Sequence, residues 1–223
     1  MRFLLLAWPV MIGLAPDPAK AAPYSFTSIN DPGAGSTYAM GINNRGQIVG
    51  YAYFAGAHQD LGHGFVDTNG NFTAINYPNA QQTYADGINN AGDIVGFYSP
   101  NGGVLAGFED SAGTFKTLPQ VAYAINDSGQ IVVVGGILDA AGTFTPINVP
   151  TAQFATNTFS MGINNHGQIS GSYVAIDGQG EGFVDTAGKF TTISKAGAGG
   201  TGVNGVNDAG QIVGVYDDAN GVN

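Results

Sequence analysis

The chain has 223 residues, no cysteine and a formal net charge of −10, from 16 acidic and six basic side chains. A surface of this charge repels nucleic acid and anionic membranes, which argues against both as partners and against acidic polysaccharides as ligands. The absence of cysteine excludes a disulfide framework.

The first residues have the pattern of a secretory signal peptide. Arg2 supplies a positive charge, Phe3–Ala15 is an almost unbroken apolar run, and Ala19-Lys20-Ala21 has the small residues of a cleavage site. We predict a signal peptide over residues 1–21 and export from a bacterial cell. The alternative is an uncleaved anchor helix, but the run is shorter than the roughly 20 residues that a membrane span requires.

The mature chain, residues 22–223, is long enough for one domain with its own core. It carries four basic and 15 acidic side chains, a net charge of −11, and has no apolar stretch long enough to cross a membrane. We therefore expect a single secreted or cell-surface domain without a membrane span.

A signature of nine residues occurs five times in this domain. The first asparagines of successive copies are 46, 37, 38 and 43 residues apart. A period near 40 residues is typical of repeat architectures, in which neighbouring units stack. The copies are Gly41–Val49, Gly87–Val95, Ala124–Val132, Gly162–Ser170 and Gly205–Val213.

Each copy of the signature predicts a β-hairpin. Apolar residues flank the pattern Asn-Asn/Asp-x-Gly, in which asparagine can bond its own backbone and glycine accepts the left-handed conformation of a tight turn. The residue before this glycine differs in most copies, as expected at a solvent-facing tip. We therefore interpret the asparagines and glycines as turn-forming residues, although they resemble ligands.

A second hairpin follows the signature in four units. Its strands are separated by Asp-x-x-Gly, which again favours a turn. Four short strands in about 40 residues correspond to one blade of a β-propeller, so we predict an all-β propeller of about five blade-like repeats. The second hairpins are Gly64–Ile75, Gly107–Leu118, Gly182–Ile193 and the shortened Gly136–Ile147.

The two ends of the chain predict that the last blade is split. Phe26–Ile29 is a fifth copy of the strand F-T-x-I, whereas no such strand follows the fifth signature. Pairing this N-terminal strand into the C-terminal sheet would close the ring and protect its edges. Because the G-F-V-D strand has no fifth copy, either the closing blade has three strands or the chain is a shortened version of a longer protein.

The repeated G-I-N-N-x-G-Q-I-V-G, followed by H-G-F and F-T-x-I, resembles the HAF family of extracellular repeats. The resemblance covers nearly all of Phe26–Tyr216, although the His-Ala-Phe triplet of the family is kept only as His63-Gly64-Phe65. It implies an exported bacterial protein of repeat architecture and implies no particular activity.

Two groups of residues have types that bind metal ions. One consists of aspartates at one repeat position, which could bind calcium or act as acid–base pairs, but which we interpret as the first residues of hairpin turns. The other is a loop with two histidines and an aspartate, which we interpret as solvated. We therefore predict no metal, no cofactor and no catalytic residue. The two groups are Asp67, Asp110, Asp139 and Asp185, and His58, Asp60 and His63.

Aromatic residues follow the second strand of several units and could stack on sugars, although we expect them to wedge between blades. The only two glutamates, Glu109 and Glu181, lie in corresponding strands of different repeats, and we expect them at the surface. The aromatic residues are Tyr51, Tyr53, Phe54, Tyr98, Tyr173 and Tyr216.

These features favour a non-enzymatic binding or scaffold module whose partner is a protein or a neutral glycan. The alternatives are a lectin with one shallow pocket per repeat, and a secreted hydrolase or lyase. Catalysis requires one unit that gains clustered polar residues, whereas the irregular unit, Ala124–Pro150, departs from the pattern by deletion.

Overall fold

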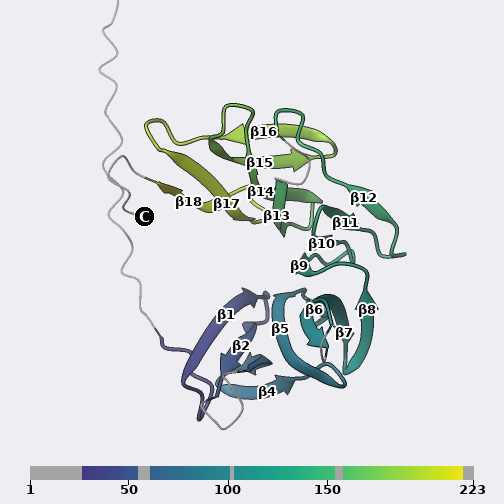
Figure 1. Cartoon of the computed structure of the whole chain (residues 1–223). Helices are drawn as coiled ribbons and strands as arrows, with labels where there is room; N and C mark the ends of the chain where they lie inside the picture. The colour runs from purple at the N-terminus through teal and green to yellow at the C-terminus, as the bar shows by residue number, and fades with distance from the viewer. Residues whose placement is uncertain (1–26, 55–60, 101–102, 154–157, 218–223) are drawn as a thin grey trace, which may run out of the picture.

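The computed structural model describes residues 27–54, 61–100, 103–153 and 158–217, which form 18 β-strands in five consecutive units (Figure 1). The predicted signal peptide (residues 1–21), Phe26, His58 and Asp60 lie outside the described residues. No helix in the described part of the chain is long and apolar enough to cross a membrane.

In each of the first four units, four strands pair antiparallel in chain order, and the fifth unit adds to the sheet of the fourth through one parallel bridge, Gly180 to Gly200. Unit 1 comprises β1 (Ser36–Ile42), β2 (Gln47–Tyr53), β3 (Gly62–Thr68) and β4 (Asn71–Ile75). Unit 2 comprises β5 (Ala80–Ile88), β6 (Ile94–Pro100), β7 (Ala106–Ser111) and β8 (Thr114–Leu118).

Unit 3 has shorter strands, and unit 5 is a hairpin. Unit 3 comprises β9 (Ala122–Ile125), β10 (Ile131–Val133), β11 (Gly136–Leu138) and β12 (Phe144–Pro146). Unit 4 comprises β13 (Thr158–Ile163), β14 (Gln168–Val174), β15 (Gly180–Thr186) and β16 (Lys189–Ile193). Unit 5 comprises β17 (Gly200–Val206) and β18 (Ile212–Asp217).

The signature forms the first hairpin of each unit, as its sequence predicts. In unit 1 the backbone N–H of Asn43 donates to Gln47 O at 3.1 Å, and the N–H of Gly46 donates to Asn43 O at 3.0 Å. Gly46 has a φ of +73°, a conformation that a side chain would strain. The same two bonds recur at Asn89, Asn126, Asn164 and Asn207.

The second hairpin turns through two residues of positive φ. In unit 1 these are Asn69 (φ +55°) and Gly70 (φ +84°), the geometry of a type I′ turn. The Asp67 carboxylate accepts the N–H of Gly70 at 2.7 Å, which explains why aspartate precedes this turn.

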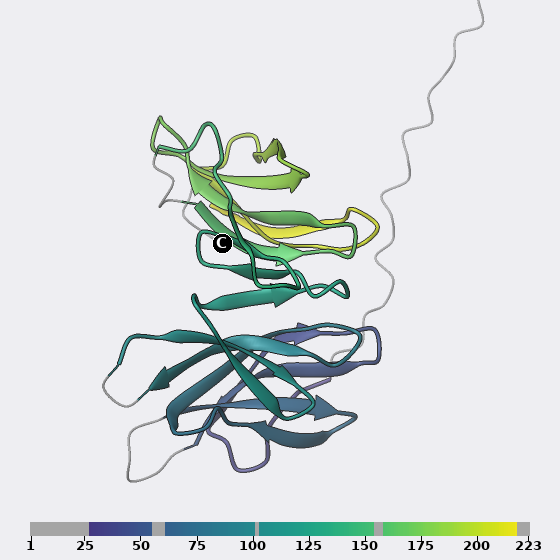
Figure 2. The ribbon, with the colours of Figure 1, turned by 90° about the vertical axis from the view of Figure 1, so that its right-hand side faces the viewer.

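The units stack face to face, so the apolar core lies between neighbouring sheets (Figure 2). Val49 of unit 1 belongs to one cluster with Ala85 of unit 2, and Val95 of unit 2 belongs to the next cluster with Ala122 of unit 3. All four residues are fully buried. A four-stranded sheet cannot bury both faces alone, and stacking supplies the missing cover.

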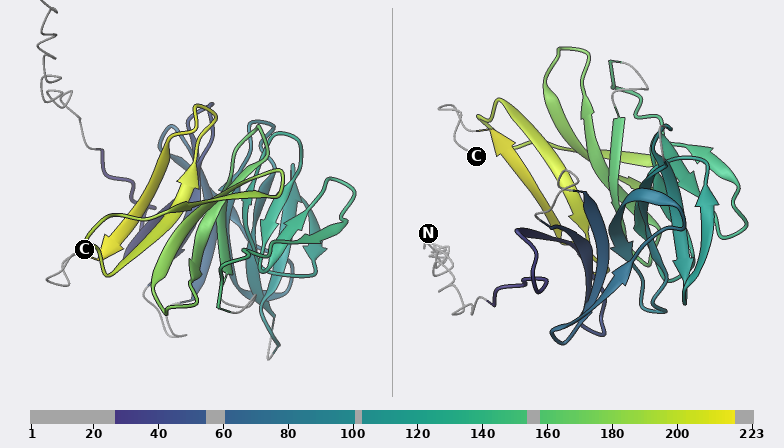
Figure 3. Two further views of the ribbon diagram at one scale, coloured as in Figure 1. Left: turned by 90° about the horizontal axis from the view of Figure 1, so that it is seen from above. Right: turned by 60° about the horizontal axis from the view of Figure 1, so that its bottom comes forward.

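The first strands of the units lie next to one another around a common axis, which confirms the propeller architecture (Figure 3). The ring is open between unit 5 and unit 1, because Val213 of β18 is 65% exposed, whereas the equivalent Val49, Val95 and Val132 are fully buried against the next unit. Four complete blades and one hairpin therefore surround the axis.

The N-terminal strand does not complete the fifth blade, contrary to the sequence-based expectation. The described part of that segment, residues 27–29, adopts no strand. In every complete unit the fourth strand pairs only with the third, as β4 pairs with β3. Among the described residues unit 5 contains no third strand, so a fourth strand has no partner there.

Candidate binding site at the ring axis

A ladder of asparagine side chains joins the units at one end of the axis. The Nδ2 atom of the first signature asparagine donates to the backbone oxygen of its counterpart in the next unit. The four bonds are Asn43 to Asn89 (3.0 Å), Asn89 to Asn126 (3.4 Å), Asn126 to Asn164 (3.1 Å) and Asn164 to Asn207 (2.9 Å). These asparagines thus bind neighbouring units as well as forming turns.

The following signature position forms a second ladder. Its backbone N–H donates to the side-chain oxygen of its counterpart in the next unit, at 2.7 to 2.8 Å. An amide or a carboxylate can accept this bond, which accounts for the alternation of asparagine and aspartate at this position. The residues are Asn44, Asn90, Asp127, Asn165 and Asp208.

Every first strand carries a β-bulge immediately before the signature. In unit 1 the register shifts between Ala39 and Gly41, so Met40 is an extra residue without a partner on β2. A bulge redirects the side chain of the extra residue, and bulges are common next to functional sites. The bulge residues of the five units are Met40, Asp86, Tyr123, Met161 and Asn204.

Four of the five bulge residues line one cavity of about 650 Å³ on the axis. Met40, Asp86, Tyr123 and Met161 contribute to its wall, together with the glycine and apolar residues that begin the signatures. A ring of isoleucine and valine side chains separates it from a hollow of about 170 Å³ over the asparagine ladders. The volume of the larger cavity is within the range of small-ligand pockets.

Asp86 is the carboxylate of this cavity. Burial raises its pKa to about 7, because no hydrogen bond or cation among the described residues stabilises its ionised form. Burial raises the pKa of Tyr123, and the charge of the nearby Asp86 raises this pKa further. A cationic group in the cavity would relieve this electrostatic cost.

The repeated aspartates do not gather into a metal site. Asp110 and Asp185 accept the N–H of Gly113 and Gly188 at 2.8 and 2.7 Å, as Asp67 does in its own unit. These bonds confirm their interpretation as turn residues. Within the described ranges no group of three histidine, aspartate or glutamate side chains could hold a metal ion.

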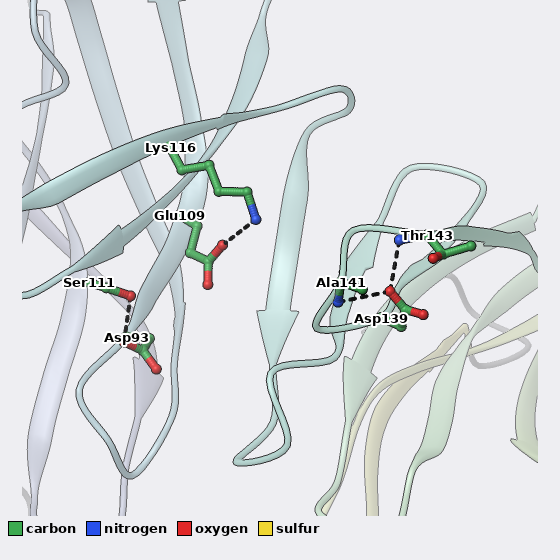
Figure 4. Close-up of polar contacts among 7 residues, drawn as sticks. All are labelled: Asp93, Glu109, Ser111, Lys116, Asp139, Ala141 and Thr143. Carbon is green, nitrogen blue, oxygen red and sulfur yellow. Dashed lines mark hydrogen bonds and ion pairs between the residues drawn. The ribbon is translucent and has the colours of Figure 1, made fainter.

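Asp139 forms a turn of a different kind in the shortened unit. Its carboxylate accepts the N–H groups of Ala141 at 3.0 Å and Thr143 at 2.7 Å (Figure 4). This is the bonding pattern of Asn43 in the first hairpin, so unit 3 forms a different turn from a segment of the same length. The backbone bonds from Thr143, Ala141 and Gly142 lower the pKa of Asp139.

The two glutamates are half-buried, more than the sequence suggested, and each has its own partners. Glu109 forms an ion pair of 3.3 Å with Lys116, which lies opposite it on β8 (Figure 4). Glu181 accepts hydrogen bonds from the hydroxyls of Tyr173 and Ser194. They lie on β7 and β15, in units 2 and 4, and each is engaged within its own unit.

The strand-end aromatic residues mostly fill space within and between the units. Tyr51 packs against Tyr84 of unit 2 with ring centroids 4.8 Å apart, and Tyr173 is almost fully buried. Tyr77 stacks on Tyr98 at 3.6 Å. Tyr216, at 48% exposure, is the most accessible of the predicted set within the described residues. The predicted aromatic residues therefore do not form an equivalent exposed platform in each unit.

His63 lies on β3, where its ring Nδ1 is 3.4 Å from Asn76 Oδ1 and the ring packs against Phe54. The other members of the predicted loop cluster, His58 and Asp60, lie outside the described residues.

The sequence interpretation missed the bulge residues. The signature begins at a glycine or, in unit 3, an alanine, and so it does not include the variable position just before this residue. The available signal was variation: Met, Asp, Tyr, Met and Asn precede five nearly identical segments. A bulge itself has no local sequence mark, because it depends on the register with the neighbouring strand.

The sheets and the axial cavity define a β-propeller-like repeat protein with a pocket on its axis. No protein-family model matches the sequence, and no curated protein matches it. Among solved structures the chain is similar to one described as "YCF48 bound to D1 peptide", with 12% identity and a TM-score of 0.49. The match covers 85% of this chain and 63% of that one. The chain thus spans less than two thirds of that structure's length.

Proposed function

We propose that this chain is an exported bacterial binding module of the HAF repeat type, without enzymatic activity, and that it binds a segment of a partner protein in its axial cavity. One observation carries the proposal. The bulge position directs a different side chain to the same cavity in successive units, whereas the turns and strands around it repeat. A constant frame with a variable lining is what a binding site requires.

The lining favours a basic segment with apolar character. Met40, Met161 and Tyr123 would contact the methylene stem of a lysine or arginine, and the Asp86 carboxylate would pair with its charged group. Methionine adapts its shape to irregular partners. The formal net charge of −10 would also attract a basic segment over longer distances.

A library of random peptides, selected on the purified chain, tests this proposal. We expect enrichment of lysine or arginine beside apolar residues. Asp86→Asn should weaken the binding of the selected peptides about tenfold, a loss of roughly 1.4 kcal/mol in binding free energy. Asp177→Asn is the matched control, because Asp177 is exposed and lies outside the cavity wall. Equal binding by both variants would refute the proposal, and a lectin would instead bind neutral glycans on an array.

A further inference from the structure

A second cavity, of about 340 Å³, lies between units 3 and 4. Its wall comes from the turn after β10, the following loop and strand β13, and Tyr123 separates it from the axis. It carries no charged side chain within the described residues. The lining residues are Tyr123, Val134, Gly135, Asn148, Thr158, Phe159 and Ser160.

The deletion in unit 3 creates this cavity. In unit 1, β2 continues to Tyr53, and Tyr51 fills the space against Tyr84 of the next unit. In unit 3, β10 ends at Val133, and the chain reverses through the following two residues. The corresponding aromatic side chain is therefore missing from the interface with unit 4.

Two hydroxyl groups in the cavity wall are buried without a partner. Thr158 is 5% exposed and Ser160 is 3% exposed, and neither hydroxyl oxygen has a hydrogen-bond partner in the described structure. A buried polar group without a partner is costly and uncommon in folded proteins.

The other units show that this arrangement is particular to unit 4. The threonines equivalent to Thr158 each accept a backbone N–H at 3.0 Å, as Thr83 does from Tyr77. The residue equivalent to Ser160 is alanine in units 1, 2 and 3. Unit 4 thus places two free hydroxyls where units 1 and 2 have a bonded threonine and an alanine methyl group.

We infer that this cavity binds a small uncharged ligand with a flat apolar ring and a hydroxyl group, that is, an aromatic alcohol. The rings of Tyr123 and Phe159 and the Val134 side chain contact the ring of the ligand. The hydroxyls of Thr158 and Ser160 bond its hydroxyl group, which supplies the partner that the protein lacks. This site is separate from the axial cavity and does not depend on the function proposed for it.

Calorimetric titration of the purified chain with 4-methylphenol and with toluene tests the inference. We expect saturable binding of 4-methylphenol and about tenfold weaker binding of toluene, which lacks the hydroxyl group. In the double variant Thr158→Val/Ser160→Ala toluene should still bind, and the two ligands should bind with about equal affinity. The melting temperature of the variant should not fall, because no protein hydrogen bond is lost.

Thr83→Val is the matched control, since Thr83 accepts the N–H of Tyr77. It should lower the melting temperature and leave the preference for 4-methylphenol intact. The inference is overturned if 4-methylphenol does not bind saturably, if methyl glucoside binds more tightly, or if the preference survives in the double variant. A melting temperature that falls as far as in Thr83→Val would equally overturn it, by showing that the hydroxyls have protein partners.

Discussion

At the scale of single residues, Asp86 makes the stability of the chain depend on pH. Burial raises its pKa to about 7 in the folded state, against about 4 in an unfolded chain. The folded state therefore binds the proton more tightly, and stability decreases as pH rises from about 4 to about 7.

Asp86→Asn should remove this dependence. We expect the variant to match the parent near pH 4 and to exceed it above pH 7 by about 2–4 kcal/mol in free energy of unfolding. Urea unfolding at a series of pH values measures the difference. Burial also raises the pKa of Asp110 and Asp185. Their effect on the pH dependence of stability is the same in the parent and the variant, so it cancels in the difference. Parallel curves for the two proteins would show that Asp86 is not buried as described.

At the scale of elements, the five first hairpins are alike in their turns and differ in what joins them. Asn126 accepts the N–H groups of Ser128 and Gln130 and also donates to Asn164 O of the next unit. Asn207 forms the same turn bonds and accepts the Asn164 side chain through its backbone oxygen, but within the described residues its own side chain bonds no other unit. A comparison of Asn126 with Asn207 therefore distinguishes the contribution of the turn bonds from that of the side-chain bond between units.

Asn126→Ala should destabilise the chain by about 3 kcal/mol, and Asn207→Ala by about 1 kcal/mol, because only the first change also removes a buried bond between units. Chemical denaturation of both variants gives the two values. Equal losses of stability in the two variants would mean that the side-chain bonds between units contribute no stability beyond that of the turns.

At the scale of the whole molecule, the open side of the ring exposes surface that the other units bury. Val49, Val95 and Val132 are fully buried against the next unit, whereas the equivalent Val213 on β18 is 65% exposed. Val215, on the same face of β18, is 55% exposed. An apolar face at the edge of a sheet favours association between molecules.

We therefore expect the chain to self-associate as its concentration rises, and sedimentation velocity measures this. Val213→Lys/Val215→Lys should shift the population toward monomer without lowering the melting temperature, because both side chains are exposed. The same change in a buried valine, Val95→Lys, is the control and should unfold the chain. Association that persists unchanged in the double variant would place the contact elsewhere.

The hairpins and their number were predictable because their causes are local. Asn43 and Gly46 close a turn within five residues, and Asp67 and Gly70 do so within four, so the residue types alone indicate the conformation. The stacking of units followed from the need to cover both faces of each sheet. The prediction that Phe26–Ile29 forms a strand of the last blade is wrong over its described residues, 27–29, because a strand forms only where a neighbouring strand supplies its partners.

The site depended on contacts between segments about 40 residues apart. Whether Asn126 reaches Asn164, whether Asp86 loses its water, and whether Thr158 keeps a partner are all decided by how neighbouring units pack. Repeated turn chemistry is a property of the chain itself. Desolvation, cavity formation and the use of a bulge residue arise only when one sheet is laid against the next, and these are the features that distinguish one unit from another.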